Sequence, residues 1–123
     1  MNLAREKVIA VIDDDSMMLQ ALTRLLKVQG FHVRAFSSAH AFLDGNAIHE
    51  VDCLVLDIGL TGMSGIELAH RMNADGSAVP VIFITGLNTE ELRADAMKTG
   101  CVGYLRKPFP ASQLLNAIER AIP

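Results

Sequence analysis

Short runs of apolar residues alternate along the chain with longer stretches in which apolar residues recur every three or four positions. The short runs predict strands, and the longer stretches predict amphipathic helices with one apolar face. The expected strands are Val8–Ile12, His32–Phe36, residues 53–56, residues 79–84 and residues 102–105. A helical pattern follows each of them, so five strand–helix units are expected.

Residues suited to helix termini mark the limits of these helices. The expected starts are Ser16, Ser38, Ile66, Asn88 and Pro110, with the third helix ending at Asn73. Asn88 with Glu91 three residues later resembles a capping box, and Pro110 suits a first helical turn. Gly30 and Gly100 are expected to end the first and fourth helices.

The apolar pattern of the strands also predicts the fold class. Most of the strands are continuously apolar, which is typical of parallel strands that are buried on both faces. Right-handed crossovers then place helices on both sides of the sheet. The expected fold is therefore α/β, with a doubly wound, five-stranded parallel sheet.

Composition narrows the possible functions. The chain has 123 residues, of which 50% are hydrophobic, enough for one domain with a sizeable core. No apolar run is long enough to cross a membrane, and residues 1–7 are too polar for a signal peptide, so a cytoplasmic location is expected. The net charge of −3, with scattered Lys and Arg, argues against direct contact with nucleic acid. Cys53 and Cys101 have no CxxC or Cys/His pattern, which predicts free, partly buried thiols rather than zinc ligands.

Three carboxylates, Asp13-Asp14-Asp15, stand directly after the apolar run Val8–Ile12. Such side chains repel one another, and a divalent cation between them would remove the repulsion. Mg²⁺ favours oxygen ligands and commonly takes one or two carboxylates together with water and phosphate oxygens. For the triplet by itself, the simpler interpretation is a solvated acidic turn in which one Asp caps the next helix.

Further polar residues follow the later buried strands: Asp57, Thr85 and Lys107. The carboxyl ends of parallel strands share one edge of the sheet, where ligands of such folds bind. Carboxylates that hold a metal, together with an ammonium and a hydroxyl for phosphoryl oxygens, provide the groups needed for phosphoryl transfer. Asp57 is the best candidate nucleophile, because it projects singly from a central strand and a carboxylate can form an aspartyl phosphate.

Taken together, these segments resemble the receiver domain of response regulators in two-component signalling. The matching segments are Asp13-Asp14, Leu54-Val55-Leu56-Asp57, Met63-Ser64-Gly65, Thr85-Gly86 and Tyr104-Leu105-Arg106-Lys107-Pro108-Phe109. The likeness extends from Val8 to the last helix, and residues 57–68 and 96–109 are most similar to receivers that carry helix-turn-helix output domains. The resemblance implies a flavodoxin-like (βα)5 fold with strand order 2-1-3-4-5.

The resemblance implies a metal-assisted phosphoacceptor. Asp57 would accept a phosphoryl group from a phosphohistidine of a sensor histidine kinase or phosphotransfer protein. Asp14 and Asp57 would ligate Mg²⁺ directly, and Asp13 would act largely through water. The backbone carbonyl of Gly59 would be a further ligand, and Mn²⁺ would be able to substitute for Mg²⁺. The domain would catalyse only its own phosphorylation and dephosphorylation, so it would not be an enzyme in the ordinary sense.

The resemblance also implies a conformational switch. Lys107 would contact the phosphoryl group, Thr85 would move toward it, and Tyr104 would swing into the vacated space. This movement would reshape the surface of the fourth helix, fifth strand and fifth helix, and so control a downstream output such as transcription. The expected domain is a single receiver over residues 1–123, either free-standing or the N-terminal part of a longer regulator. The sequence leaves phosphorylation-dependent dimerisation open.

Some positions depart from the receiver pattern or have a simpler explanation. Gly59 stands where many receivers have a larger side chain, Thr61 where proline is frequent, and Gly103 where a side chain is common. Asp15 is expected to be a solvated neighbour or a helix cap without a metal role. The methionines expected to serve in packing are Met17, Met18, Met63, Met72 and Met97.

Two other functions stay open at this point. An aspartyl-phosphate phosphatase of the haloacid-dehalogenase type would use Asp13 as nucleophile and Asp15 as general acid. It would want Thr or Val where Met17 stands, and it would leave Asp57 without a role. A protein-interaction module on the same fold would not be phosphorylated, but such modules generally lack some of the acidic or Lys positions that are present here.

Overall fold

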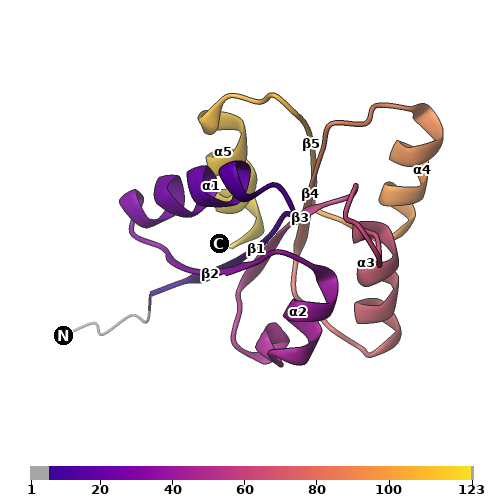
Figure 1. Cartoon of the computed structure of the whole chain (residues 1–123), viewed down its shortest axis with the longest axis horizontal. Coiled ribbons are helices and arrows are strands. Elements are labelled where there is room, and N and C mark those ends of the chain that lie inside the picture. The colour runs from indigo at the N-terminus through magenta and orange to yellow at the C-terminus, as the bar shows by residue number, and fades with distance from the viewer. Residues whose placement is uncertain (1–5, 123) are drawn as a thin grey trace.

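In the computed structural model, which describes residues 6–122, five parallel strands form one sheet (Figure 1). The strands are β1 (Val8–Ile12), β2 (His32–Phe36), β3 (Cys53–Asp57), β4 (Val81–Thr85) and β5 (Gly103–Arg106). Their order in the sheet is β2-β1-β3-β4-β5, and every neighbouring pair is parallel. This confirms the expected α/β fold and its strand order.

Helices cover both faces of the sheet, with α1 and α5 on one side and α2, α3 and α4 on the other (Figure 1). Their bounds are α1 Ser16–Val28, α2 Ala39–Asp44, α3 Gly65–Ala74, α4 Glu90–Lys98 and α5 Ala111–Ala121, with a short 3₁₀ helix at Ala47–His49. Alternate residues of a strand point to opposite faces. Ile9 and Val11 therefore pack with α1 and α5, whereas Ala10 and Ile12 pack with α2 and α3.

The three central strands differ from the two edge strands in burial. Every residue of β3 and β4 is buried, and so are the last four residues of β1. Strand β2 contains only exposed and partly buried residues, in line with the more exposed strand that its sequence predicts, and β5 is mostly partly buried. The last residues of the central strands lie at one edge of the sheet, directly after buried backbone. A polar residue at that point is therefore held in place by the packed strand that precedes it.

Some of the expected helix limits are confirmed, and others were wrong by one or two residues. Helix α1 begins at Ser16, as expected, and its cap is Asp15, which is one of the two roles expected of that residue: the Asp15 carboxylate accepts hydrogen bonds from the backbone N–H groups of Met17 and Met18. Helix α4 is capped by Thr89 instead of Asn88, because the Thr89 hydroxyl accepts from the N–H of Leu92. At each of these two helices, adjacent residues were suitable caps, and only the backbone decides between them.

Two further limits involve proline. Pro110 lies in extended backbone just before α5 and is the cap residue, one position earlier than expected. Strand β4 begins at Val81 instead of residue 79, because Pro80 has no N–H with which to join the ladder. Helix α3 is one residue longer at each end than the expected 66–73.

The packing role expected of the methionines holds for Met72, which is buried, but was wrong for Met17 and Met97. Met17 is 79% exposed, since it projects outward from the first turn of α1, and Met97 is 44% exposed.

Both cysteines are free thiols: Cys53 is buried, which raises its pKa to about 12, and Cys101 is partly buried. Among residues 6–122, no helix has the length and apolar character needed to span a bilayer.

Candidate functional site

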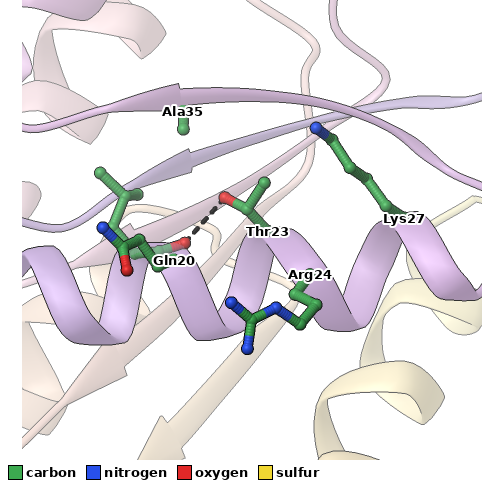
Figure 2. Close-up of a pocket in the computed structure, with 6 residues that line it drawn as sticks. Gln20, Thr23, Arg24, Lys27 and Ala35 are labelled. Atoms are coloured by element: carbon green, nitrogen blue, oxygen red, sulfur yellow. Dashed lines mark hydrogen bonds between the residues drawn. The ribbon is translucent and has the colours of Figure 1, made fainter.

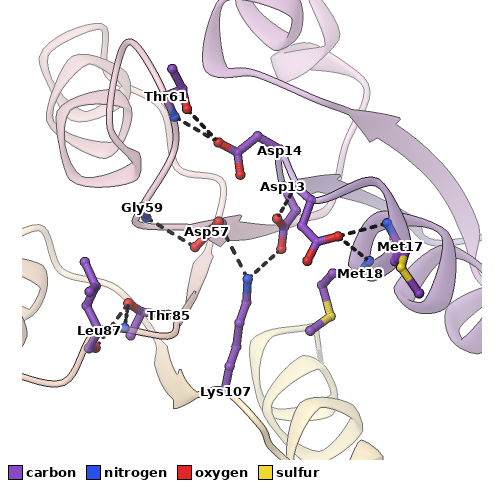
Figure 3. Close-up of polar contacts among 11 residues, drawn as sticks. Asp13, Asp14, Met17, Met18, Asp57, Gly59, Thr61, Thr85, Leu87 and Lys107 are labelled. Atoms are coloured by element: carbon purple, nitrogen blue, oxygen red, sulfur yellow. Dashed lines mark hydrogen bonds and ion pairs between the residues drawn. The ribbon is translucent and has the colours of Figure 1, made fainter.

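Three carboxylates meet at the carboxyl edge of the sheet. Asp13 and Asp14 follow β1, and Asp57 is the last residue of β3, the neighbouring strand. One carboxylate oxygen of each lies within 4.8 Å of the others. The sequence expectation that these residues converge is therefore met in the structure (Figure 3).

Asp13 is the most buried member of the cluster, with no exposed surface. Its Oδ2 accepts a hydrogen bond from the Nζ of Lys107 at 2.8 Å, and its Oδ1 accepts one from the backbone N–H of Asp15 at 2.9 Å. A buried carboxylate is tolerable when a cation and hydrogen bonds compensate its charge. Both oxygens of Asp13 are thus already engaged, which distinguishes it from the more open Asp14.

Asp57 is 6% exposed and lies between a cation and a backbone donor. The N–H of Gly59 donates to its Oδ1 at 3.2 Å, and the Nζ of Lys107 lies 3.6 Å from its Oδ2. Burial, and then the charge of Asp13, raise the pKa of Asp57, and this outweighs the lowering by Lys107 and by the Gly59 N–H. The carboxylate is therefore more basic than an ordinary aspartate.

Lys107 reaches across the site from the residue after β5 (Figure 3). Its backbone N–H donates to the carbonyl of Thr85 at 2.7 Å, and the peptide bond to Pro108 is cis. Burial lowers the pKa of the ammonium, but the hydrogen bond that it donates to Asp13 and the charge of Asp57 raise this pKa by more. Lys107 is therefore a permanent cation between two carboxylates at neutral pH.

The hydroxyls of the two expected switch residues are not hydrogen-bonded to the carboxylate cluster. The hydroxyl of Thr85 is buried and bonds to Leu87, donating to its carbonyl at 3.1 Å and accepting from its N–H at 2.9 Å (Figure 3). The hydroxyl of Tyr104 is buried and has no hydrogen-bond partner within residues 6–122. The guanidinium of Arg93 lies 5.2 Å from the centre of the Tyr104 ring.

Two loop residues complete the surroundings of the site. At Gly59, a Cβ atom would meet only Oδ1 of Asp57, at 3.9 Å, so this side of the carboxylate is open. Thr61 donates from both its N–H and its hydroxyl to Oδ2 of Asp14, each at 3.0 Å. Sequence reasoning gave Thr61 no role. The only signal was that it replaces a frequent proline, and neither bond could exist with proline.

The cluster fits a hard divalent cation by the chemistry of its donors. Asp13, Asp14 and Asp57 provide carboxylate oxygens from three separate residues, and Lys107 compensates only part of their charge. Mg²⁺ prefers oxygen ligands and is commonly bound directly by one or two carboxylates. Cys53 and Cys101 lie outside this cluster, so soft thiolate ligands are not part of it.

A groove elsewhere on the surface contains none of these residues. It lies between α1 and the edge strand β2 and is lined by Leu19, Gln20, Thr23, Arg24, Lys27 and Ala35 (Figure 2). The Thr23 hydroxyl on its wall donates to the backbone carbonyl of Leu19 at 2.7 Å. The groove lacks the carboxylate cluster and the buried ion pair, so it is not the candidate site.

The sequence matches one known protein family over most of its length. The family described as "Response regulator receiver domain" matches residues 9–119. The transcriptional regulatory protein FixJ of Bradyrhizobium diazoefficiens is 43% identical over 114 residues, which cover 93% of this chain and 56% of FixJ. The response regulator protein TmoT of Ectopseudomonas mendocina is 36% identical over 118 residues, which cover 96% of this chain and 54% of TmoT. The chain therefore spans about half the length of the curated relatives it matches.

Solved structures show the same likeness. The response regulator StyR aligns with a TM-score of 0.88 and 37% identity, over 96% of this chain and 60% of StyR. The structure of FixJ-N aligns with a TM-score of 0.85 and 32% identity, over 96% of this chain and 94% of that one. The likeness to FixJ-N therefore extends over nearly the whole of that solved chain.

Proposed function

The chain belongs to the response regulator receiver domain family of two-component signalling, and on this premise we propose that Asp57 is its phosphoacceptor. The donor is the phosphohistidine of a sensor histidine kinase or of a phosphotransfer protein. The observation that carries the proposal is the position of Asp57, a buried carboxylate with an open side at Gly59 and a lysine ammonium 3.6 Å away.

In the proposed transfer, an oxygen of Asp57 attacks the phosphorus of the phosphohistidine. A P–O bond forms as the P–N bond breaks, and the donor histidine keeps the electron pair and takes a proton from water. The raised pKa of Asp57 favours attack, because a more basic carboxylate is a better nucleophile. The domain catalyses only the gain and loss of its own phosphoryl group.

Lys107 has two roles in this proposal. Before transfer it compensates the charges of Asp13 and Asp57, which it contacts at 2.8 and 3.6 Å. During transfer its ammonium binds a phosphoryl oxygen, where negative charge accumulates. The cation is already in place, so little rearrangement is needed at the moment of reaction.

The metal in this proposal is Mg²⁺, which Mn²⁺ can replace. Asp14 and Asp57 would hold it directly, Asp13 through water, and the carbonyl of Gly59 as a further ligand. When bound, the ion neutralises charge on the carboxylates and on the phosphoryl oxygens. Asp13 suits an indirect role because both of its oxygens already accept hydrogen bonds.

Phosphorylation would act on the output through Thr85 and Tyr104. The Thr85 hydroxyl must leave Leu87 to reach a phosphoryl oxygen on Asp57, which would free the start of the loop before α4. Tyr104 then moves into the vacated space, and the surface formed by α4, β5 and α5 changes shape. Three of the relatives are named transcriptional regulatory proteins, and the chain matches about half of their length, so we infer transcription control as the output.

Labelling with acetyl phosphate tests the proposal against the phosphatase alternative. We expect Mg²⁺-dependent incorporation of one phosphoryl group into the wild-type chain and none into Asp57→Asn. Asp13→Asn should retain labelling, at a reduced rate. The reverse pattern, with labelling lost in Asp13→Asn and kept in Asp57→Asn, would contradict the proposal and support Asp13 as nucleophile. Absence of both labelling and Mg²⁺ binding would favour a non-phosphorylated interaction module.

A further inference from the structure

The three carboxylates of the acidic cluster have different sets of donors, although Lys107 serves both Asp13 and Asp57. Asp13 is held by Lys107 and by the backbone of Asp15, and Asp57 by Lys107 and by the backbone of Gly59. Asp14 contacts neither set. Within residues 6–122, its only hydrogen bonds come from Thr61, at 3.0 Å from the backbone N–H and 3.0 Å from the hydroxyl (Figure 3).

We propose that Thr61 is a positioning residue for Asp14, and that its two hydrogen bonds fix this carboxylate for metal binding. The inference rests on the proposed function, since it concerns the same Mg²⁺ site. The inference adds to this site a residue that does not bind the metal itself: Thr61, in the loop between β3 and α3, 47 positions along the chain from Asp14.

Two donors on one oxygen of Asp14 leave its other oxygen available for metal binding. Both bonds from Thr61 end on Oδ2 of Asp14, and a carboxylate oxygen has about two lone-pair sites to offer. Oδ2 is therefore occupied, and Oδ1 is left free for a cation. Ligating carboxylates are commonly held by such outer hydrogen bonds, which fix the ligand before the ion arrives.

Exposure makes this restraint necessary. Asp14 and Thr61 are both exposed, whereas Asp13 and Asp57 are buried and held by packing as well as by hydrogen bonds. An exposed aspartate without a partner would sample several rotamers, and binding an ion would then cost the entropy of selecting one. The hydroxyl of Thr61 removes part of that cost in advance.

Thr61 also departs from the receiver pattern, in which proline is frequent at this position. Proline has no N–H and no hydroxyl, so it could make neither bond to Asp14. This chain thus has a two-donor restraint on the most exposed carboxylate of the cluster, at a position where the usual residue could provide none.

Calorimetric titration of the whole 123-residue chain with MgCl₂ tests the inference. Thr61→Val keeps the shape of the side chain and the backbone N–H but loses the hydroxyl. It should weaken Mg²⁺ binding about three- to tenfold, because loss of an outer-shell partner typically weakens metal binding by about tenfold or more and the backbone N–H still holds Asp14. Thr61→Ser keeps the hydroxyl and should bind within about twofold of wild type. Thr23→Val, which loses a hydroxyl bond to the Leu19 carbonyl on the wall of the α1–β2 groove, is the matched control and should leave Mg²⁺ binding unchanged.

A second measurement needs no metal. Scalar couplings of the Asp14 side chain in metal-free protein should report one dominant χ1 rotamer in wild type and Thr61→Ser, and averaged rotamers in Thr61→Val. Equal Mg²⁺ dissociation constants for wild type and Thr61→Val, or averaged Asp14 couplings already in wild type, would overturn the role of Thr61 while leaving the phosphoacceptor intact. Absence of Mg²⁺ binding by wild type would instead overturn the metal site on which both depend.

Discussion

The Nζ of Lys107 lies 2.8 Å from Oδ2 of Asp13, a carboxylate with no exposed surface. This ion pair joins the residue after β5 to the residue after β1, across the two strands that lie between them in the sheet. A buried carboxylate that loses its only cationic partner keeps its full desolvation cost. The pair is therefore part of the fold as well as of the site.

Lys107→Met should lower the free energy of unfolding by about 2–3 kcal/mol at pH 7, because it leaves the Asp13 carboxylate buried without a cation. The pKa of Lys107 is raised in the folded state, so its contribution is complete below 10.5 and is lost as the pH rises through the higher folded value. Urea unfolding from pH 7 upward measures this difference. The exposed control Lys27→Met should change stability by no more than about 0.5 kcal/mol. Equal stability of Lys107→Met and wild type at pH 7 would show that the pair does not support the fold.

Asp57→Asn should have the opposite effect and raise the melting temperature by about 3 °C at pH 7. Burial and the charge of Asp13 raise the pKa of Asp57 in the folded state, so ionisation of this residue costs stability at all pH values above that raised pKa. The cost, and with it the advantage of the variant, should disappear as the pH falls through the raised pKa toward the ordinary value of 3.8.

Thermal unfolding of wild type and Asp57→Asn between pH 3 and pH 7 measures this difference. Asp95→Asn, on the exposed side of α4, is the control and should show no such pH-dependent gain. A loss of stability in Asp57→Asn at pH 7 would mean that the Lys107–Asp57 contact outweighs burial and charge repulsion.

Much of the site was predictable because a parallel sheet places the ends of its strands together. Asp13, Asp14 and Lys107 follow a strand and Asp57 ends one, so the apolar pattern alone located them at one edge. The hydroxyl of Thr85 could not be placed in this way, since its bond to Leu87 depends on the conformation of the following loop. The contact between Thr61 and Asp14 joins two loops and has no periodic signal in the sequence.

Helix caps were ambiguous in the sequence for a related reason. Asp15 and Ser16 are both good caps, and the choice of Asp15 follows from its extended backbone after β1. Met17 was expected in the core by residue type, but its place in the first turn of α1 directs it outward. Apolar patterns longer than one helical turn predicted the helices and strands reliably. The role of a single residue at the end of an element depended on the local backbone geometry.

Gly59→Arg should lengthen the lifetime of the phosphorylated state by about tenfold, equivalent to about 1.4 kcal/mol in the barrier to hydrolysis. The glycine leaves one side of Asp57 open, since a Cβ there would meet only Oδ1, at 3.9 Å. A long side chain at this position has room to cover the acyl phosphate and hinder attacking water. Loss of the labelled phosphoryl group over time, after removal of the donor, measures the rate. An unchanged rate in both Gly59→Arg and Gly59→Asn would show that this opening does not control water access.

Arg93→Gln should loosen Tyr104, because the Arg93 guanidinium lies 5.2 Å from the ring centre and such a contact contributes about 0.5–1 kcal/mol. The chain has one tyrosine and no tryptophan, so its intrinsic fluorescence reports this ring alone. We expect stronger quenching by acrylamide in Arg93→Gln than in wild type. Arg120→Gln, at the end of α5, should match wild type, and an unchanged quenching constant in Arg93→Gln would show that Arg93 does not restrain the ring.

Direct identification of the phosphorylated residue tests the central claim. Borohydride reduces an aspartyl phosphate to homoserine, which marks the modified position permanently for mass spectrometry of peptides. After reaction of the wild-type chain with acetyl phosphate and Mg²⁺, we expect homoserine at position 57 and aspartate at positions 13, 14 and 15. Homoserine at position 13 with intact Asp57 would contradict the assignment of Asp57 as the phosphoacceptor.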